Sequence, residues 1–371
     1  MNLNRMGSFL LQCIRADSAN ELKHSVGTFL QDGGQAYWPL LLEPSFRVSL
    51  PIYLKARSFS VDLQLPRKLE KKLRFKALSN RERNRRFKDA VAELAGAFNR
   101  AGLNLIVLKG GSYLFTCYTD VPEARAMSDL DILVQRSDLV DAERVLRSIG
   151  YRDCYEDFLR RVAPVARRRF LERHHFHFAY AKDSILVELH WDLGVTCHAS
   201  LVERCFASSC LIEAGPTALR ILDPAATVFL VCYDFVRDEL KRSLWRRDRT
   251  TSMQALGELA FFFLDLRTIV GGYADALSWR EVLGYAALSG RKNQILACFG
   301  LARYVGGVDL PACMIEAIAT RPTVSWYLQM SRRVQYHQLT RFLLLHHILA
   351  QRSRRALTAP GMRHYFHTMA G

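Results

Sequence analysis

The stretch Ser128-Asp129-Leu130-Asp131-Ile132-Leu133-Val134 decides the fold of this chain. Side chains two residues apart in a strand point the same way, so Asp129 and Asp131 project side by side. The apolar residues between and after them take the opposite face, which has to be buried. The stretch therefore predicts a buried strand that carries two neighbouring carboxylates.

The two neighbouring carboxylates have a chemical consequence. They repel each other and raise each other's pKa unless a cation lies between them. Carboxylate oxygens are also the ligands that Mg²⁺ takes when it binds substrate phosphates. Asp-x-Asp is a common surface pattern as well, so the pair alone does not establish a metal site.

A third carboxylate follows in a second predicted strand, Val187 to Asp192, on whose polar face Glu188 and His190 lie together. With the aspartate pair, Glu188 completes a set that can hold two metal ions about 3.5–4 Å apart for in-line phosphoryl displacement. Two other interpretations stay open. Glu188 is otherwise a polar residue on the solvated side of an edge strand, and His190 is more often a structural histidine than a ligand.

A glycine turn precedes these strands. The apolar run Leu103 to Leu108 leads into Lys109-Gly110-Gly111-Ser112, which predicts a buried strand that feeds a helix. Glycines let backbone N–H groups approach phosphate oxygens, and a helix N-terminus adds a favourable dipole. Lys109 and Ser112 supply further donors. The turn matches neither a Walker A loop nor a dinucleotide fingerprint, and by itself such a turn is more often only a turn.

Three regions differ in their patterns. Residues 1–86 are predicted to be mainly helical, residues 87–215 to form the domain with the strands, and residues 216–371 to be helical again. In the second region the elements expected are a helix Lys88–Arg100 capped by Gly102, a helix Asp138–Ile149 followed by Gly150, and a hairpin of His175–Tyr180 and Ile185–Trp191 around Lys182-Asp183-Ser184. In the third region Asp223-Pro224 starts a helix, and helices are expected at 225–236, 254–270, 279–289, 292–304 and 325–349.

Composition narrows the class of protein. With 371 residues the chain can form two or three domains. Its formal charge of +16 predicts attraction to polyanions such as nucleotides or nucleic acid. No run reaches the roughly 20 apolar residues that a membrane helix needs, and the start lacks a secretory leader pattern. The nine scattered cysteines contain no Cys-x-x-Cys pair, so we expect reduced thiols in a cytoplasmic protein.

Two further clusters leave alternatives open. Eleven Lys or Arg residues lie between Arg67 and Lys88. They form either a solvated helix face or a surface that steers nucleic acid or substrate. The run Arg173-His174-His175-Phe176-His177 suggests zinc, but no further ligand stands at a convincing spacing. A role for it in a site wall or on the surface is the expectation. No Gly-x-Ser-x-Gly elbow supports a hydrolase.

The combination of turn and carboxylates resembles the DNA polymerase β-like nucleotidyltransferase superfamily. More narrowly, residues 87–290 are similar to a bacterial family of uncharacterised nucleotidyltransferases, through Leu108-Lys109-Gly110, Tyr118, Arg125, Ser128 to Val134, Gly150-Tyr151, Glu188-Leu189-His190-Trp191, Leu222-Asp223-Pro224, Phe263-Leu264-Asp265-Leu266 and Trp279. Sixteen residues separate Ser112 from Asp129, a longer loop than is usual in the superfamily, and the narrower family shares it.

The resemblance implies an α+β fold, with a small mixed sheet flanked by N- and C-terminal helical regions. It implies that Asp129, Asp131 and Glu188 are catalytic and hold Mg²⁺ or Mn²⁺, and that Lys109, Gly110, Gly111, Ser112 and Arg125 bind the nucleotide. The expected activity is transfer of a nucleoside monophosphate, AMP from ATP, to a hydroxyl or phosphate of a small molecule, peptide or tRNA. The alternative is a catalytically idle protein that binds nucleotide or nucleic acid. The sequence names neither the acceptor nor the oligomeric state.

Overall fold

The computed structural model describes residues 3–36, 38, 47–154, 176–194, 199–214, 217–245, 251–304, 306–322 and 324–325. Two compact units divide the chain. The first unit takes residues 1–86, 112–127 and 224–344, and the second takes 87–111, 128–223 and 345–371. Helices and a mixed sheet are both present, so the predicted α+β class is confirmed.

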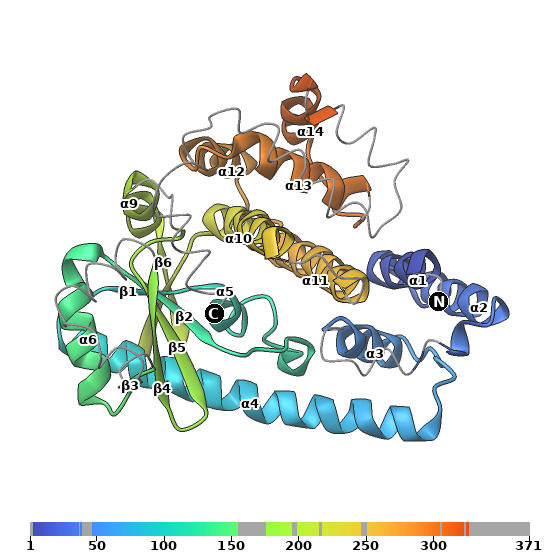
Figure 1. Ribbon diagram of the computed structural model, residues 1–371, viewed down its shortest axis with the longest axis horizontal. Coiled ribbons are helices and arrows are strands. Elements are labelled where there is room, and N and C mark those ends of the chain that lie inside the picture. Colours follow the sequence, from blue (N-terminus) through green and yellow to red (C-terminus); the bar gives the residue numbers. More distant parts are fainter. Residues whose placement is uncertain are drawn as a thin grey trace. The chain divides into compact units, whose positions relative to one another are not determined.

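The second unit is built on a mixed sheet of seven strands in the order β3-β4-β5-β2-β1-β7-β6 (Figure 1). The strands are β1 (Leu105–Val107), β2 (Leu130–Val134), β3 (Arg152–Asp153), β4 (His177–Lys182), β5 (Ile185–His190), β6 (Cys210–Ala214) and β7 (Thr217–Ile221). β2 pairs antiparallel with β1 and parallel with β5. The strand that begins just after Asp129 therefore lies at the centre of the sheet.

Burial explains why the sequence of β2 is so apolar. All five of its residues are buried, and neighbouring strands pair with both of its edges. The residue that departs from this apolar pattern is Asp131, which is only 6% exposed. A buried carboxylate in a central strand needs partners, and the site described below supplies them.

Helices complete the second unit. They are the end of α4 (Arg67–Arg100), α6 (Leu139–Ser148) and α9 (Ala199–Ser208). Figure 1 shows α6 along one face of the sheet, where Tyr180 of β4 donates to Glu143 at 2.7 Å. The expected caps are confirmed: Gly102 after α4 and Gly150 after α6 have φ of 70° and 92°, values that glycine adopts readily.

The first unit is helical. Its helices are α1 (Leu3–Arg15), α2 (Ala19–Gln31), α3 (Ser49–Ser58), the first part of α4, α10 (Pro224–Trp245), α11 (Thr251–Gly272), α12 (Trp279–Leu288), α13 (Lys292–Tyr304) and α14 (Ala312–Ala319). In the N-terminal part the rings of Phe9 and Phe29 stack at 4.0 Å, and Trp38 lies against both. These three aromatic residues belong to a large buried core that also includes Ala260 of α11.

Several elements differ from the sequence expectations. The predicted helix Lys88–Arg100 is the second half of a 34-residue helix that starts at Arg67. The predicted hairpin is present with its strand boundaries moved by one or two residues. The region from 216 onward, expected to be helical, starts with β7, and its first helix begins at Pro224 as predicted. The sequence patterns did not predict α9, β6 or α14.

The expected helix at 325–349 lies outside the described residues except for Ser325, and so do His174 and His175 of the histidine run. The basic stretch lies on α4, where four of its arginines pair with described carboxylates: Arg74 with Glu70, Arg81 with Glu123, and Arg85 and Arg86 with Glu82. Among the helices that the structure describes, none combines the length and the apolar character needed to cross a membrane.

Candidate active site

Two neighbouring parallel strands bring the three predicted carboxylates together. β2 and β5 pair so that Asp131 lies opposite Glu188, and register partners point to the same face of a sheet. Asp129 is the residue directly before β2, two positions from Asp131, and it is half-buried. All three residues belong to the second unit.

Lys109 reaches this group from the end of β1. The Leu108 amide donates to the Asp131 carbonyl oxygen at 2.9 Å, which extends the β1–β2 pairing by one residue. Lys109 comes next, at the start of α5 (Lys109–Tyr113), with a φ of 47° that non-glycine residues rarely adopt. Its Nζ donates to Asp131 Oδ1 at 2.6 Å. The turn thus places an ammonium group on the central aspartate.

Two histidines lie on the same face of the sheet. His190 Nε2 is 2.9 Å from Asp131 Oδ1 and 3.3 Å from Glu188 Oε2. His177 of β4 is the register partner of His190, and its Nε2 is 3.7 Å from Glu188 Oε1. Because one nitrogen contacts both acids, the carboxylates of Asp131 and Glu188 lie within the span of a two-metal site.

The charges of the acids are unevenly balanced. Burial raises the pKa of Asp131, but Lys109 and His190 outweigh it and hold that pKa well below its usual range. For Asp129, burial and then the charges of Asp131 and Glu188 raise the pKa. No hydrogen bond from a cationic side chain is described for Asp129 to offset these effects, as Lys109 does for Asp131. Ser128 Oγ donates a hydrogen bond to Asp129 Oδ1 at 3.1 Å.

The pKa values of the two histidines shift in opposite directions. Burial and the neighbouring His190 lower the pKa of His177 to about 3, so its imidazole is neutral at pH 7. Burial also lowers the pKa of His190, but its hydrogen bonds to Asp131 and Glu188 outweigh that effect and raise it. For Glu188, burial raises the pKa, but the hydrogen bond from His190 outweighs burial and brings the pKa below its usual value.

Close packing against β1 and β2 explains why the turn has glycine at position 111. A Cβ on Gly111 would lie 2.5 Å from Leu130 Cδ1 and 2.7 Å from Val107 Cγ1, closer than side chains approach. Gly111 therefore lets the turn pack directly on β1 and β2. Gly110 beside it is buried too. Phosphate binding by Gly110 and Gly111 stays a prediction.

Ser112 and Arg125 belong to the first unit. Ser112 is buried, and its carbonyl oxygen accepts from Thr116 Oγ1 at 3.2 Å. Arg125 pairs with Asp265 of α11, which also accepts from the Tyr118 hydroxyl at 2.8 Å. Both residues thus have partners inside their own unit, and their contact with a triphosphate stays a prediction.

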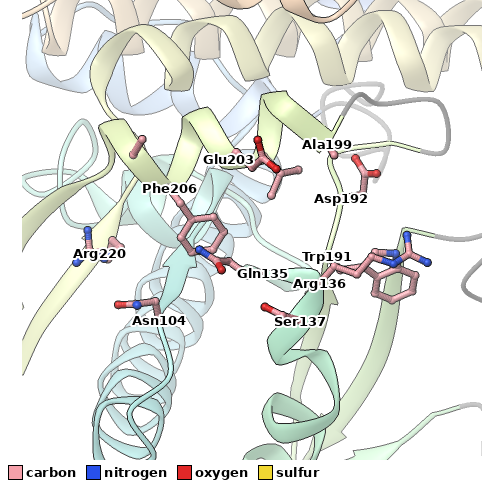
Figure 2. Close-up of a pocket in the computed structure, with 12 residues that line it drawn as sticks. Asn104, Gln135, Arg136, Ser137, Trp191, Asp192, Ala199, Glu203, Phe206 and Arg220 are labelled. Carbon is pink, nitrogen blue, oxygen red and sulfur yellow. The ribbon is translucent and has the colours of Figure 1, made fainter.

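A cavity of about 640 Å³ lies in the second unit beyond the carboxyl ends of β2 and β5 (Figure 2). Its wall carries both charges, with Arg136 and Arg220 as cations and Asp192 and Glu203 as anions, and Phe206 of α9 adds an aromatic ring. Asp129, Asp131 and Glu188 are not among the lining residues. The cavity and the carboxylates thus occupy different positions along the same two strands.

Carboxylates gathered on adjacent strands are donors of the kind that hold divalent metals in phosphatases, polymerases and nucleases. The family model described as "Uncharacterised nucleotidyltransferase" matches residues 45–307, and the chain belongs to that family. The predicted resemblance is thereby confirmed. The family assigns the chain to the nucleotidyltransferases in general, with a nucleotide as substrate. No curated protein and no solved structure matches the chain.

Sequence reasoning missed two features of this site. It placed Lys109 near a triphosphate and did not predict its contact with Asp131. It also expected His177 in a site wall or on the surface, and it did not predict that the side chain lies against Glu188 and His190. The signal was available: in a hairpin with a two-residue turn at Asp183-Ser184, His177 and His190 become cross-strand partners.

Proposed function

We propose that this protein is a metal-dependent nucleotidyltransferase that moves AMP from ATP to an acceptor hydroxyl or phosphate on a small molecule, peptide or tRNA. The observation that carries the proposal is the register of β2 and β5, which sets Asp131 opposite Glu188 with Asp129 two residues upstream. Three carboxylates on one face of two adjacent strands are the donor set that this chemistry requires.

The residues fit a bound divalent cation. Asp129 is half-buried, and two neighbouring acids raise its pKa, so a positive charge beside it would relieve the repulsion. Asp129, Asp131 and Glu188 would hold Mg²⁺ or Mn²⁺, both of which favour carboxylate oxygens. When bound, the metal would neutralise phosphate charge and lower the pKa of the acceptor hydroxyl.

The chain's own residues then have distinct tasks. The Lys109 ammonium, which lies between the turn and Asp131, can pair with phosphate oxygens. In this proposal Glu188 accepts the proton of the acceptor hydroxyl. The acceptor oxygen forms a bond to the α-phosphorus, the bond between that phosphorus and the bridging oxygen to the β-phosphate breaks, and pyrophosphate leaves. Gly110 and Gly111 of the same unit complete the proposed nucleotide contacts there, and nucleotide binding by Ser112 and Arg125 of the first unit stays a prediction.

The first prediction concerns the carboxylates. Asp129→Ala and Asp131→Asn remove proposed metal ligands, so we expect release of pyrophosphate from ATP to fall below detection. Glu188→Gln removes a base while it keeps the shape, and should lower turnover by at least about 10²-fold. The assay is incubation of the full chain with Mg²⁺ or Mn²⁺ and a cell lysate as the source of acceptor, with γ-labelled ATP to follow pyrophosphate and α-labelled ATP to follow AMP on the acceptor.

The matched control is Asp141→Ala, which removes an exposed acid of α6 in the same unit and should leave turnover unchanged. Full activity in Asp129→Ala would end the assignment. The same assay addresses the idle alternative: a wild-type chain that binds ATP by calorimetry but releases no pyrophosphate with either metal is a binding protein.

A further inference from the structure

A second group of potential ligands lies beside the carboxylates, on the hairpin of β4 and β5. Among the described residues, His177, Glu188 and His190 each offer one ligand atom, and these atoms lie within 4.8 Å of one another. The histidines are cross-strand partners, and Glu188 is two residues before His190. Three side chains thus converge on one face because the hairpin register places them there.

The distances suit a metal ion. The Nε2 atom of His190 lies 3.3 Å from one oxygen of the Glu188 carboxylate, and the Nε2 atom of His177 lies 3.7 Å from the other. Ligands bound at about 2.0–2.1 Å in tetrahedral geometry lie about 3.4 Å apart, so small side-chain rotations would close the group around an ion. The side chain of Glu188 is 22% exposed and retains freedom to make that adjustment.

Burial adds a second observation. The Nδ1 atoms of His177 and His190 are both buried, and neither has a hydrogen-bond partner among the described residues. Buried polar atoms are normally paired with protein, water or an ion. These nitrogens lie on the opposite side of each ring from the Nε2 atoms that face Glu188, so no described hydrogen bond at Nδ1 fixes either ring, and both rings can turn toward an ion.

The donor set selects the kind of metal. Imidazole nitrogens bind Zn²⁺, Co²⁺ and other transition metals, whereas Mg²⁺ prefers oxygen ligands and keeps several waters. Two histidines with one carboxylate leave open positions on the ion for a water or substrate oxygen, as in zinc sites that do chemistry. This group therefore differs in chemistry from the pair Asp129 and Asp131 next to it.

We propose that His177, Glu188 and His190 bind one transition-metal ion of the Zn²⁺ class, next to the site at Asp129 and Asp131. Glu188 belongs to both sites, and in that respect the inference rests on the proposed function. The protein then has one position that prefers oxygen-bound Mg²⁺ and one that prefers an imidazole-bound metal. The competing interpretation is that His190 only ties Asp131 to Glu188 by hydrogen bonds and that no metal binds the histidines.

The experiment uses the chelator-treated full chain and Co²⁺ alone, without nucleotide. Tetrahedral Co²⁺ absorbs visible light strongly and octahedral Co²⁺ weakly, so the spectrum reports the ligand geometry. We expect one Co²⁺ per chain with the intense spectrum, displaced by an equivalent of Zn²⁺ but not by excess Mg²⁺. His177→Ala should weaken Co²⁺ binding at least about tenfold, the lower end of the loss seen even for residues that only support a ligand.

Two variants serve as controls. His24→Ala removes an exposed histidine of α2 in the first unit and should leave Co²⁺ binding unchanged. Asp129→Ala should retain Co²⁺ binding while it loses nucleotidyl transfer, because Asp129 belongs only to the oxygen site. Circular dichroism checks folding, and Glu188→Gln provides the same loss of a ligand with the shape preserved if His177→Ala does not fold.

The outcomes separate the two proposals. Co²⁺ binding that depends on His177, in a chain that releases no pyrophosphate, supports the metal site and ends the proposed function. Nucleotidyl transfer with Mg²⁺ in a chain whose Co²⁺ binding is absent, or equal in wild type and His177→Ala, overturns the metal site and leaves the function standing. A weak octahedral spectrum that disappears in Asp129→Ala would likewise place the ion on the carboxylates and overturn the inference.

Discussion

At the scale of single residues, Gly111 shows how packing constrains the turn beside the candidate active site. A Cβ at this position would meet Leu130 and Val107 at 2.5 and 2.7 Å. We expect Gly111→Ala to lower the free energy of unfolding by about 1–3 kcal/mol, the range for an overpacked core. Urea denaturation followed by circular dichroism measures this loss.

The matched control is the same substitution at Gly27, inside α2, where nothing lies within 4 Å of the added Cβ. There alanine should stabilise the chain by about 0.5–1 kcal/mol, because glycine loses more conformational freedom on folding. If both variants change stability in the same direction, the packing explanation for Gly111 is wrong. Comparing ATP affinity in a folded Gly111→Ala then tests its phosphate role separately.

At the scale of elements, the β4–β5 hairpin positions His177, Glu188 and His190 through its turn. Lys182 pairs with Ile185, and Asp183 between them has a φ of 52°. Left-handed backbone costs most L residues about 1–2 kcal/mol, whereas glycine tolerates it and aspartate or asparagine tolerate it in part.

We therefore expect Asp183→Gly to keep or raise stability and Asp183→Val to lower it by about 1–2 kcal/mol. Thermal denaturation of the two variants beside Asp183→Asn, which should match the wild type, checks the order. If Asp183→Val is as stable as Asp183→Gly, the turn does not require a left-handed backbone at this residue.

At the scale of the whole molecule, each unit gathers segments that lie far apart in the chain. Within the first unit, Arg125 of the 112–127 segment pairs with Asp265 of α11, 140 residues later. Asp265 is 6% exposed, and the guanidinium lies over the rings of Tyr113 and Phe261 at 5.0 and 5.2 Å. The pair therefore joins two separated segments in a buried setting.

Asp265→Ala leaves the Arg125 charge buried without its partner, and we expect it to cost about 3–5 kcal/mol of stability. The control is Asp141→Ala, which breaks an exposed pair with Arg144 on α6 and should cost no more than about 1 kcal/mol. Equal losses in chemical denaturation of the two variants would contradict the structural role given to the buried pair.

Local patterns in the sequence determined much of the fold. The alternation at Asp129 to Val134 predicts a buried strand with both aspartates on one face, and β2 is a buried strand that contains Asp131 and begins directly after Asp129. Gly102, Gly150 and Asp223-Pro224 mark helix ends that the structure contains. These predictions succeed because helix caps and strand periodicity depend on backbone geometry within a few residues. β6 was missed because its residues are only partly buried and carry no strong apolar pattern.

The tertiary structure decided which of these elements meet. The sequence puts Glu188 on a strand, but only the parallel pairing of β5 with β2 sets it opposite Asp131. The same holds for the contact of Lys109 with Asp131. Strand neighbours and register are fixed by burial shared among distant segments, and no window of the sequence contains both partners. The candidate ligands were therefore determined by the sequence, whereas their charge balance and their grouping around one point were determined by the sheet.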